Sequence, residues 1–401
     1  MGFGAVWPLA ALEMPPFLVF RKPASCACGY PLVSITPCSG VQAFALTSTA
    51  ARGYLGGLRV VHCGRVTKDR AMAQPRETIA VSELDEPTTL AQTVTQWQAR
   101  WQPEVKGLEI NRLIEAPTWT VLIIAYRSKA FLLDCIARVR DCRLPSGTTL
   151  EVLVADCGGL EALRPRLRDV ADRVITLTPD IGLNPARNAA IAWAAGKYVA
   201  LLDDDGEIEP DWIANAQRHL EDPAVVALRG KIVFKQHRYF TTLASHYDRG
   251  ANVVDDTLAV EGNMAIRRSA YFAAGGFGER FYGGEGAQLT YALLQRFAGL
   301  RVIYAPDVVM RHDYFQSWQH FIKKSMMYGD IMNKLALQEP EAEAMLAWIR
   351  ADWDKAKPRR TMRLDERLAW MSLCTLRAGL QTAARLQQAA PVNRANLSPR
   401  R

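Results

Sequence analysis

The sequence predicts an α/β protein with a Rossmann-like, doubly wound central sheet. From Trp119 onward, short apolar segments alternate with segments whose apolar residues recur at helical spacing. Three of the apolar segments end abruptly in polar or acidic residues. Because a doubly wound sheet binds its ligands at the carboxyl ends of its strands, these polar ends predict a site along one edge of the sheet.

The expected elements follow the chain in order. Strands are expected at residues 120–125, 151–155, 174–177 and 199–202. Helices are expected at residues 130–140, 160–170, 185–195, 288–298 and 318–337, and residues 88–101 are expected to form an amphipathic helix or a linker. Asn184 is the expected cap of the helix that begins at Pro185. No glycine separates the first strand from its helix between Tyr126 and Phe131, which disfavours a dinucleotide fold or a P-loop.

The segment KYVALLDDDGEIEPDW, at residues 197–212, carries the clearest sign of chemistry. A short apolar strand ends there at three adjacent aspartates, which repel one another unless a cation or water offsets their charge. Carboxylate oxygens at a strand end suit Mg²⁺ or Mn²⁺. The alternative is a solvated acidic turn before a helix that Pro210 starts.

Composition limits the classes of protein that the chain can belong to. Its 401 residues, 49% hydrophobic and 22% charged, can form one large or two ordinary domains. The net charge of +8 is compatible with phosphorylated ligands, acidic polymers or an anionic membrane surface. No basic run with interleaved aromatic residues is present, so nucleic-acid binding is not expected.

The eight cysteines are scattered without the spacing of a disulfide framework, which indicates reduced thiols in a cytoplasmic protein. Cys26, Cys28, Cys38 and Cys63 match no closed zinc pattern. Glu13 and several prolines interrupt the apolar residues at the start of the chain, so neither a cleaved signal nor a spanning helix is expected.

Several motifs, taken in order, resemble glycosyltransferase family 2 enzymes of the GT-A fold. They are TVLIIAYRS, VLVADCGG, IGLNPARNAAIAWAAGKYVALLDDD with its DxD motif, EGNMAIRRSAYFAAGGFGERFYGGEG, and the strand that leads to His312. The resemblance covers about residues 119–328. It implies a mixed central sheet, and transfer of a sugar from a nucleotide diphosphate to an acceptor hydroxyl of a glycan or a lipid-linked acceptor, with inversion.

The resemblance also implies roles for individual residues. The donor-binding residues would be Ala125, Tyr126, Arg127, Asp156, Arg187, Asn188, Asp203 and Asp204. The metal ligands for Mg²⁺ or Mn²⁺ would be Asp203, Asp205 and His312. The acceptor-side residues would be Gly262, Asn263, Gly284 and Glu285. Read without the resemblance, a lone histidine is more often structural, and Arg187 is an ordinary helical arginine.

The sequence departs from the family at the catalytic base. Gly283, Gly284 and Glu285 match a Gly-Gly-Glu-Asp segment, but Gly286 stands where the family has its aspartate. Glu285 is the expected catalytic residue, either taking the proton or orienting the acceptor, and its alternative role is to cap the following helix. Two other functions stay open: a catalytically silent sugar-nucleotide-binding or scaffold protein, and nucleotidyl transfer, which the missing glycine-rich loop disfavours.

The expected domain organisation has four parts. They are a poorly patterned N-terminal extension at 1–103, the glycosyltransferase domain at 117–330, a helical C-terminal extension at 331–390 and a disordered tail at 391–401. The C-terminal extension combines an apolar stripe with several arginines. It is expected either to dock on the catalytic domain or to make peripheral contact with the inner face of a membrane.

Overall fold

The structure of the chain, a computed structural model, describes residues 81–126, 131–279, 284–297, 299–327 and 362–389. These residues belong to one compact unit, Val66–Arg401. The strands are β1 (Val105–Ile110), β2 (Trp119–Ala125), β3 (Leu150–Asp156), β4 (Arg173–Leu177), β5 (Tyr198–Asp203), β6 (Glu207–Ile208), β7 (Val225–Val233), β8 (Val254–Asp255), β9 (Asn263–Arg267) and β10 (Arg301–Arg311). The α-helices are α1 (Val81–Leu84), α2 (Pro87–Trp101), α3 (Phe131–Arg140), α4 (Arg164–Val170), α5 (Leu183–Trp193), α6 (Trp212–Leu220), α7 (Arg238–Thr241), α8 (Arg268–Ala273), α9 (Glu285–Arg296) and α12 (Leu364–Ala389). Three 3₁₀ turns are η1 (Gln102–Glu104), η2 (Glu161–Leu163) and η3 (Ser245–Tyr247).

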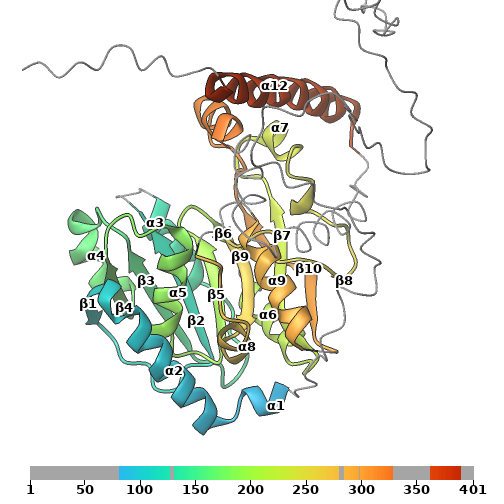
Figure 1. Cartoon of the computed structure of the whole chain (residues 1–401). Helices are drawn as coiled ribbons and strands as arrows, with labels where there is room; N and C mark the ends of the chain where they lie inside the picture. The colour runs from blue at the N-terminus through green and yellow to red at the C-terminus, as the bar shows by residue number, and fades with distance from the viewer. Residues whose placement is uncertain (1–80, 127–130, 280–283, 298, 328–361, 390–401) are drawn as a thin grey trace, which may run out of the picture. The chain divides into compact units, whose positions relative to one another are not determined.

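The strands of the described residues form one mixed sheet in the order β1-β4-β3-β2-β5-β9-β7-β10-β6, with β8 beside β10 (Figure 1). Strands β4, β3, β2 and β5 are parallel neighbours. Strand β9 runs antiparallel to both β5 and β7, and β10 is parallel to β7. The carboxyl ends of β2, β3, β5, β7 and β10 therefore lie at the same edge, and the predicted doubly wound, mixed sheet is confirmed.

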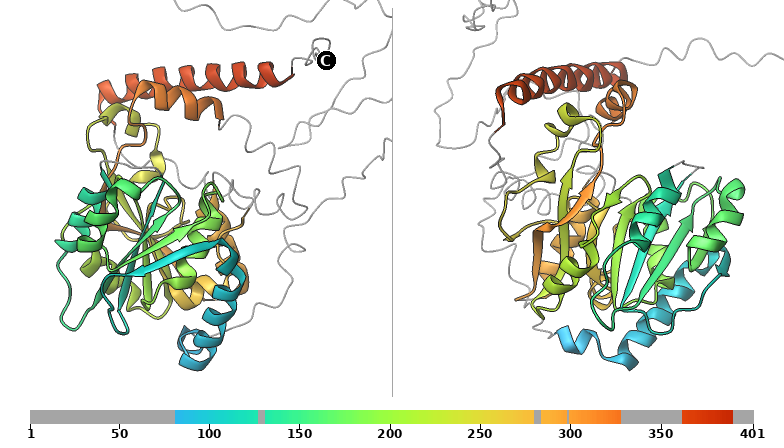
Figure 2. Two further views of the ribbon diagram at one scale, coloured as in Figure 1. Left: turned by 90° about the vertical axis from the view of Figure 1, so that its left-hand side faces the viewer. Right: turned by 180° about the vertical axis from the view of Figure 1, so that it is seen from behind.

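Helices cover both faces of the sheet, which explains the apolar strands (Figures 1 and 2). On β2, Val121 and Ile123 pack with side chains of α3, α4 and α6. Leu122, between them, packs on the opposite face with side chains of α2, α5, α8 and α9. A strand buried on both faces needs apolar residues at every position rather than at every second one.

Two expected details were wrong. Helix α5 begins at Leu183, after Gly182 with φ of 96°, and Asn184 does not cap it, because its Nδ2 donates to the carbonyl of Gly278 at 2.9 Å. Strand β10 is longer than expected. The first half of β10 was not predicted because it contains Pro306, and a proline normally argues against a strand. Pro306 lies at a register shift between Ala305 and Val309, where the ladder with β7 is interrupted.

The sheet and its core include segments that precede residue 117, where the glycosyltransferase domain was expected to begin. Strand β1 pairs antiparallel with β4 at the sheet edge. Trp97 and Trp101 of α2 are buried against the face that α5 and α8 cover. Of the helix and the linker expected at 88–101, the helix is observed as α2. Residues 1–80 of the predicted extension lie outside the described residues.

The C-terminal helix α12 contacts the elements that follow β7 and β10. Leu373 joins a cluster with Phe240, Phe315 and Phe321, and Glu366 accepts from Arg238 at 2.9 Å. Figures 1 and 2 show α12 beside the helix formed by residues 318–327. Docking, one of the two expected uses of this helix, is therefore observed. Residues 328–361 and the predicted tail lie outside the described residues.

No helix among the described residues is long and apolar enough to cross a membrane. The described cysteines, Cys135, Cys142, Cys157 and Cys374, are free thiols. Burial raises the pKa of Cys157 to about 12, with a further contribution from the charge of Asp156.

Candidate active site

Two carboxylates and one imidazole meet at the carboxyl edge of the sheet. Asp203 ends β5, Asp205 follows two residues later, and His312 comes directly after β10. Ligand atoms of the three side chains lie within 4.8 Å of one another. His312 Nε2 is 3.3 Å from Asp205 Oδ1 and 3.8 Å from Asp203 Oδ2. We call these three residues the metal cluster. Asp204 is buried and is not part of it.

The electrostatics of the metal cluster fit a divalent cation. Burial alone lowers the pKa of His312, but its hydrogen bond with Asp205 and the charges of Asp203 and Asp205 outweigh burial and raise it. The two carboxylates thus favour the protonated imidazole, whose positive charge offsets theirs. Oxygen and imidazole donors are ordinary ligands of divalent cations, which displace such a proton on binding.

Gly262 lets the chain approach Asp203 closely. A Cβ at position 262 would lie 2.0 Å from Asp203 Oδ2, and the carbonyl of Gly262 accepts from the Asp203 amide at 3.1 Å. The next residue, Asn263, is buried. Its Oδ1 accepts from Trp212 Nε1 at 2.7 Å and its Nδ2 donates to the Lys231 carbonyl at 3.1 Å. The Asn263 side chain therefore joins β9 to α6 and β7.

The expected donor residues lie at the ends of β2 and β3. Ala125 is paired with Asp156 in register. The buried Asp156 carboxylate accepts from Arg164 Nη2 at 2.7 Å and from the Gly158 amide at 2.9 Å. Tyr126 is partly exposed, and its hydroxyl donates to Asp180 at 2.5 Å. Since Ile124 of β2 is paired with Asp203, these ends share an edge with the metal cluster. Arg127 lies outside the described residues.

Arg187 and Asn188 of α5 are both buried. The Arg187 guanidinium is 3.4 Å from Asn184 Oδ1 and lies over the Phe277 ring, 5.2 Å from its centroid. Asn188 donates to the Phe277 carbonyl at 2.9 Å and accepts from its amide at 3.0 Å and from the Tyr271 hydroxyl. The Asn188 amide thus holds the segment that follows α8, and Phe277 packs in the core.

A second carboxylate accompanies Glu285, and sequence reasoning missed it. Glu285 is buried at the first turn of α9, where its Oε2 accepts from the Gly284 amide at 2.8 Å. Glu261 Oε1 accepts from the Gly286 amide at 2.6 Å. Burial and the charge of Glu285 raise the pKa of Glu261 to about 7, against the opposing effect of Arg187. We call these two residues the glutamate pair. The signal in the sequence was the Glu-Gly-Asn triplet that precedes β9.

Gly286 has a structural reason to be glycine. A Cβ at this position would lie 1.5 Å from the carbonyl oxygen of Leu258. The start of α9 is therefore packed against the chain before β9, and no side chain fits at position 286. The carboxylates at this place come from the glutamate pair instead.

Two further polar side chains contact Asp205, and neither was expected from the sequence. Gln316 Nε2 donates to the Asp205 carboxylate. Lys235 Nζ donates to the Asp205 carbonyl at 3.2 Å and pairs with Glu207 at 2.6 Å. Lys235 thus places a positive charge beside the metal cluster, where a phosphate group would be stabilised.

Comparisons with known proteins identify similar sequences. Residues 120–296 match the family model described as Glycosyl transferase family 2. The pre-mycofactocin glycosyltransferase of Mycobacterium tuberculosis is 28% identical over 183 residues, which cover 41% of this chain and 38% of that protein. The succinoglycan biosynthesis protein ExoO of Rhizobium meliloti is 32% identical over 130 residues, covering 29% of this chain and 36% of that protein. The chain spans less than two fifths of the length of these relatives.

A similar solved structure is that of a mannosyltransferase from Pyrobaculum calidifontis in complex with GDP-mannose and Mn²⁺. It is 19% identical, covers 77% of this chain and 98% of its own, and gives a TM-score of 0.47.

Proposed function

From the match of residues 120–296 to the model of glycosyl transferase family 2, we propose that this chain is a glycosyltransferase. It moves a sugar, with inversion, from a nucleotide-diphosphate sugar to an acceptor hydroxyl in glycan or glycolipid synthesis. The observation that carries the proposal is the metal cluster, which shares one sheet edge with Ala125 and Asp156. A nucleotide, its diphosphate and a cation can thus be held side by side.

On the donor side, the roles follow from position and charge. Ala125, Tyr126 and Asp156 contact the nucleotide base and ribose, and Arg164 keeps the Asp156 carboxylate oriented. Arg187, a buried cation, balances negative charge between the donor and the glutamate pair. We assign Arg127, Asn188 and Asp204 to the donor side, as the sequence predicted. The contact that supports the role of Asn188 is its hydrogen bond to the Phe277 carbonyl, which shapes the segment that follows α8.

Asp203, Asp205 and His312 hold Mg²⁺ or Mn²⁺. When bound, either ion would offset the negative charge that collects on the diphosphate as the bond to the anomeric carbon breaks. Lys235 adds a positive charge at the same place.

On the acceptor side, Glu285 takes the proton of the attacking hydroxyl. A carboxylate within hydrogen-bond reach is the usual general base for such a step. Glu261 lies beside it and next to Gly262, whose backbone touches Asp203. The glutamate pair, at the start of α9, is therefore linked to the metal cluster through Gly262. Gly284 leaves room for the acceptor along the backbone, since nothing lies within 4 Å of an added Cβ there. Gly262 belongs to the acceptor side through its close packing on Asp203.

The competing function is a catalytically silent sugar-nucleotide-binding protein, for which the glycine at 286 was the reason. The packing of Gly286 on Leu258 gives that glycine a structural explanation, and two carboxylates stay close by. Both observations favour the enzyme.

Donor hydrolysis tests the proposal. The full chain is incubated with Mn²⁺ or Mg²⁺ and a panel of uridine- and guanosine-diphosphate sugars, and release of nucleoside diphosphate is measured. We expect release that EDTA abolishes and that Asp205→Asn lowers by roughly 10²-fold or more, whereas Asp222→Asn, in a surface turn, serves as the control. Binding of a nucleotide sugar with no turnover would support the silent protein instead.

We also propose that the protein is cytoplasmic and touches the inner face of the membrane through α12. Leu364, Leu368 and Met371 are exposed and share one face of this helix, and the exposed Arg363 and Arg367 flank them. Apolar and basic residues together favour anionic lipid surfaces. Co-sedimentation with vesicles that contain an anionic lipid should fall for Leu368→Glu, and equal binding by both proteins would contradict the contact.

A further inference from the structure

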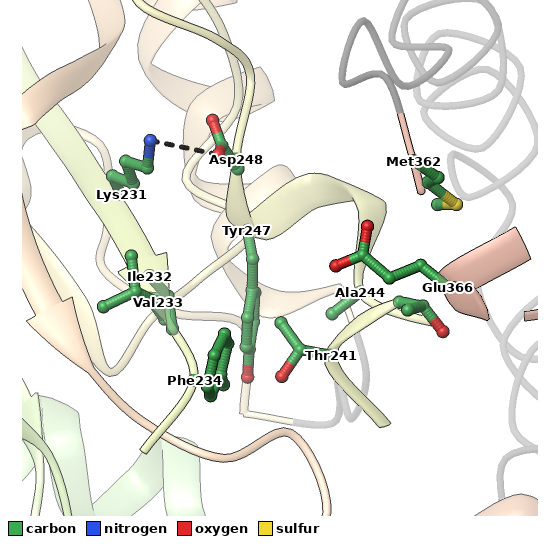
Figure 3. A pocket seen from close by; sticks show the side chains of 11 residues that line it. Lys231, Ile232, Val233, Phe234, Thr241, Ala244, Tyr247, Asp248, Met362 and Glu366 are labelled. Atoms are coloured by element: carbon green, nitrogen blue, oxygen red, sulfur yellow. Dashed lines mark ion pairs between the residues drawn. The ribbon is translucent and has the colours of Figure 1, made fainter. Parts of the chain in front are cut away.

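A cavity of about 230 Å³ lies at the carboxyl end of β7 (Figure 3). The end of β7 and the residues after it supply Ile232 and Phe234, and η3 supplies Tyr247. Met362 lies just before α12, and Glu366 lies in its first turn. In Figure 3 the side chains from β7 and from α12 lie on opposite sides of the Tyr247 ring. The cavity is thus built where α12 meets the sheet, and the roles proposed above do not use it.

The cavity adjoins the candidate active site through two direct contacts. Tyr247 forms one wall of the cavity, and its hydroxyl lies 3.2 Å from Nδ1 of His312. This side chain therefore connects the cavity with the metal cluster. The carbonyl of Lys231, another lining residue, accepts from Asn263, two residues after Glu261. The cavity therefore neighbours both the metal cluster and the segment that carries Glu261.

The order of groups along the sheet edge indicates from which side an acceptor would approach the donor sugar. Asp156 lies on β3, Asp203 on β5, and the cavity on β7, with β2 and β9 between them. A donor whose base lies at Asp156 and whose diphosphate lies at Asp203 extends its sugar away from β3. The acceptor must approach from the far side of that sugar, which is the side of β7.

The walls of the cavity suit an uncharged ligand. Lys231 Nζ pairs with Asp248 at 3.0 Å, and Glu366 pairs with Arg238 at 2.9 Å. Because each of these charges is balanced within the protein, the cavity offers no net charge to a ligand. The Tyr247 and Phe234 rings supply apolar faces that suit a flat or ring-shaped group. An apolar cavity of roughly 150 Å³ holds benzene, so this larger one has room for a single substituted ring.

We propose that this cavity is the acceptor site, and that it takes an uncharged ring that bears the reacting hydroxyl group. The proposal rests on the proposed function. In the reaction the acceptor O–H bond breaks and its oxygen bonds to the anomeric carbon of the donor sugar. The bond from that carbon to the diphosphate breaks, and its electron pair leaves with the diphosphate. The proton passes to the glutamate pair.

The experiment compares transfer with hydrolysis in the full chain. The probes are phenols and naphthols, in which the phenyl or naphthyl ring itself bears the hydroxyl group, and the donor is whichever nucleotide sugar the wild-type chain hydrolyses with Mn²⁺. Met362→Trp places a large ring in the cavity, and we expect the ratio of transfer to hydrolysis to fall roughly tenfold or more. Met327→Trp, the same substitution at an exposed site on the helix at 318–327, should leave the ratio unchanged.

A second variant acts in the opposite direction. Phe234→Ala enlarges the cavity, and we expect preference to shift several-fold from the phenyl to the naphthyl probes. A ratio for Met362→Trp equal to that of Met327→Trp would overturn the acceptor site. So would a wild-type chain that hydrolyses donor but neither glycosylates nor, by saturation-transfer NMR, binds any ring probe. If the wild-type chain binds the probes in the cavity but turns over no donor, the proposed function fails and the binding site stands.

Discussion

The Tyr247 hydroxyl lies 3.2 Å from Nδ1 of His312, while Nε2 of the same ring faces Asp205 at 3.3 Å. When Nδ1–H donates to the tyrosine oxygen, Nε2 keeps its lone pair for a cation. Groups that bind the far nitrogen of a ligating histidine fix its tautomer and its orientation. Tyr247 is therefore a positioning residue for the metal cluster.

Tyr247→Phe should weaken Mn²⁺ binding by roughly 10- to 100-fold, because the imidazole loses the partner that orients it. Isothermal titration of the full chain with Mn²⁺ measures the affinity, and far-UV circular dichroism checks the fold. Tyr239→Phe, at an exposed tyrosine of α7, is the matched control. Equal affinity in the two variants would remove Tyr247 from this role.

Mn²⁺ affinity should depend on pH over a range above the ordinary histidine pKa of about 6.5. The hydrogen bond with Asp205 and the nearby carboxylate charges raise the pKa of His312 despite its burial. A cation competes with that proton, so affinity should rise as the pH increases through the raised pKa and fall below it. Titrations with Mn²⁺ between pH 5.5 and pH 8.5, at constant ionic strength, measure this change in affinity. His312→Gln should bind Mn²⁺ weakly, with no change in affinity over this pH range. If the pH dependence persisted in this variant, it would belong to another group.

Gly286→Ala should destabilise the fold. A Cβ there would lie 1.5 Å from the Leu258 carbonyl oxygen, so α9 must move away from the chain before β9. Overpacking of this kind costs about 1–3 kcal/mol of unfolding free energy, which urea denaturation measures. Gly379→Ala is the contrasting variant, because nothing lies within 4 Å of the added Cβ on α12, and alanine in a helix should stabilise it by about 0.5–1 kcal/mol. Equal stability of Gly286→Ala and the wild-type chain would contradict the packing argument.

The sequence was enough to predict the centre of the fold, where strands are buried on both faces. In β2 and β5, nearly continuous apolar residues distinguish a buried strand from a helix or a loop. Strand β1 was not predicted. It lies at the sheet edge, where exposed and partly buried residues alternate over only six positions. Strand β10 was shortened because Pro306 lies inside it, and a proline normally argues against a strand.

The site was predictable where chain order places residues at strand ends. The family resemblance grouped Asp203 and His312, each of which follows a strand, and the structure brings them together. Glu261 could not be found in this way, because its partner Glu285 comes from α9 and only the tertiary packing at Gly286 joins them. For Asn263, the residue type does not reveal whether the amide faces a ligand or, as here, Trp212 and a backbone carbonyl.

The glutamate pair should give the rate of transfer a step near neutral pH. Burial and the charge of Glu285 raise the pKa of Glu261 to about 7, so Glu261 is protonated below that pH and ionised above it. Its ionisation adds negative charge where the acceptor hydroxyl loses its proton, and kcat should therefore rise with pH through about 7. Glu261→Gln keeps an oxygen for the Gly286 amide but stays neutral, so it should abolish this step.

Glu285→Gln removes the base itself and should lower kcat by roughly 10²- to 10⁴-fold at every pH. Single-turnover kinetics at saturating donor separate this chemical effect from donor binding, whose affinity should not change. Glu221→Gln, just after α6, is the surface control for both variants. If Glu261→Gln kept the wild-type step near pH 7, the step would belong to another group. If Glu285→Gln kept the wild-type kcat while Glu261→Gln lost it, Glu261 would be the base and Glu285 its partner.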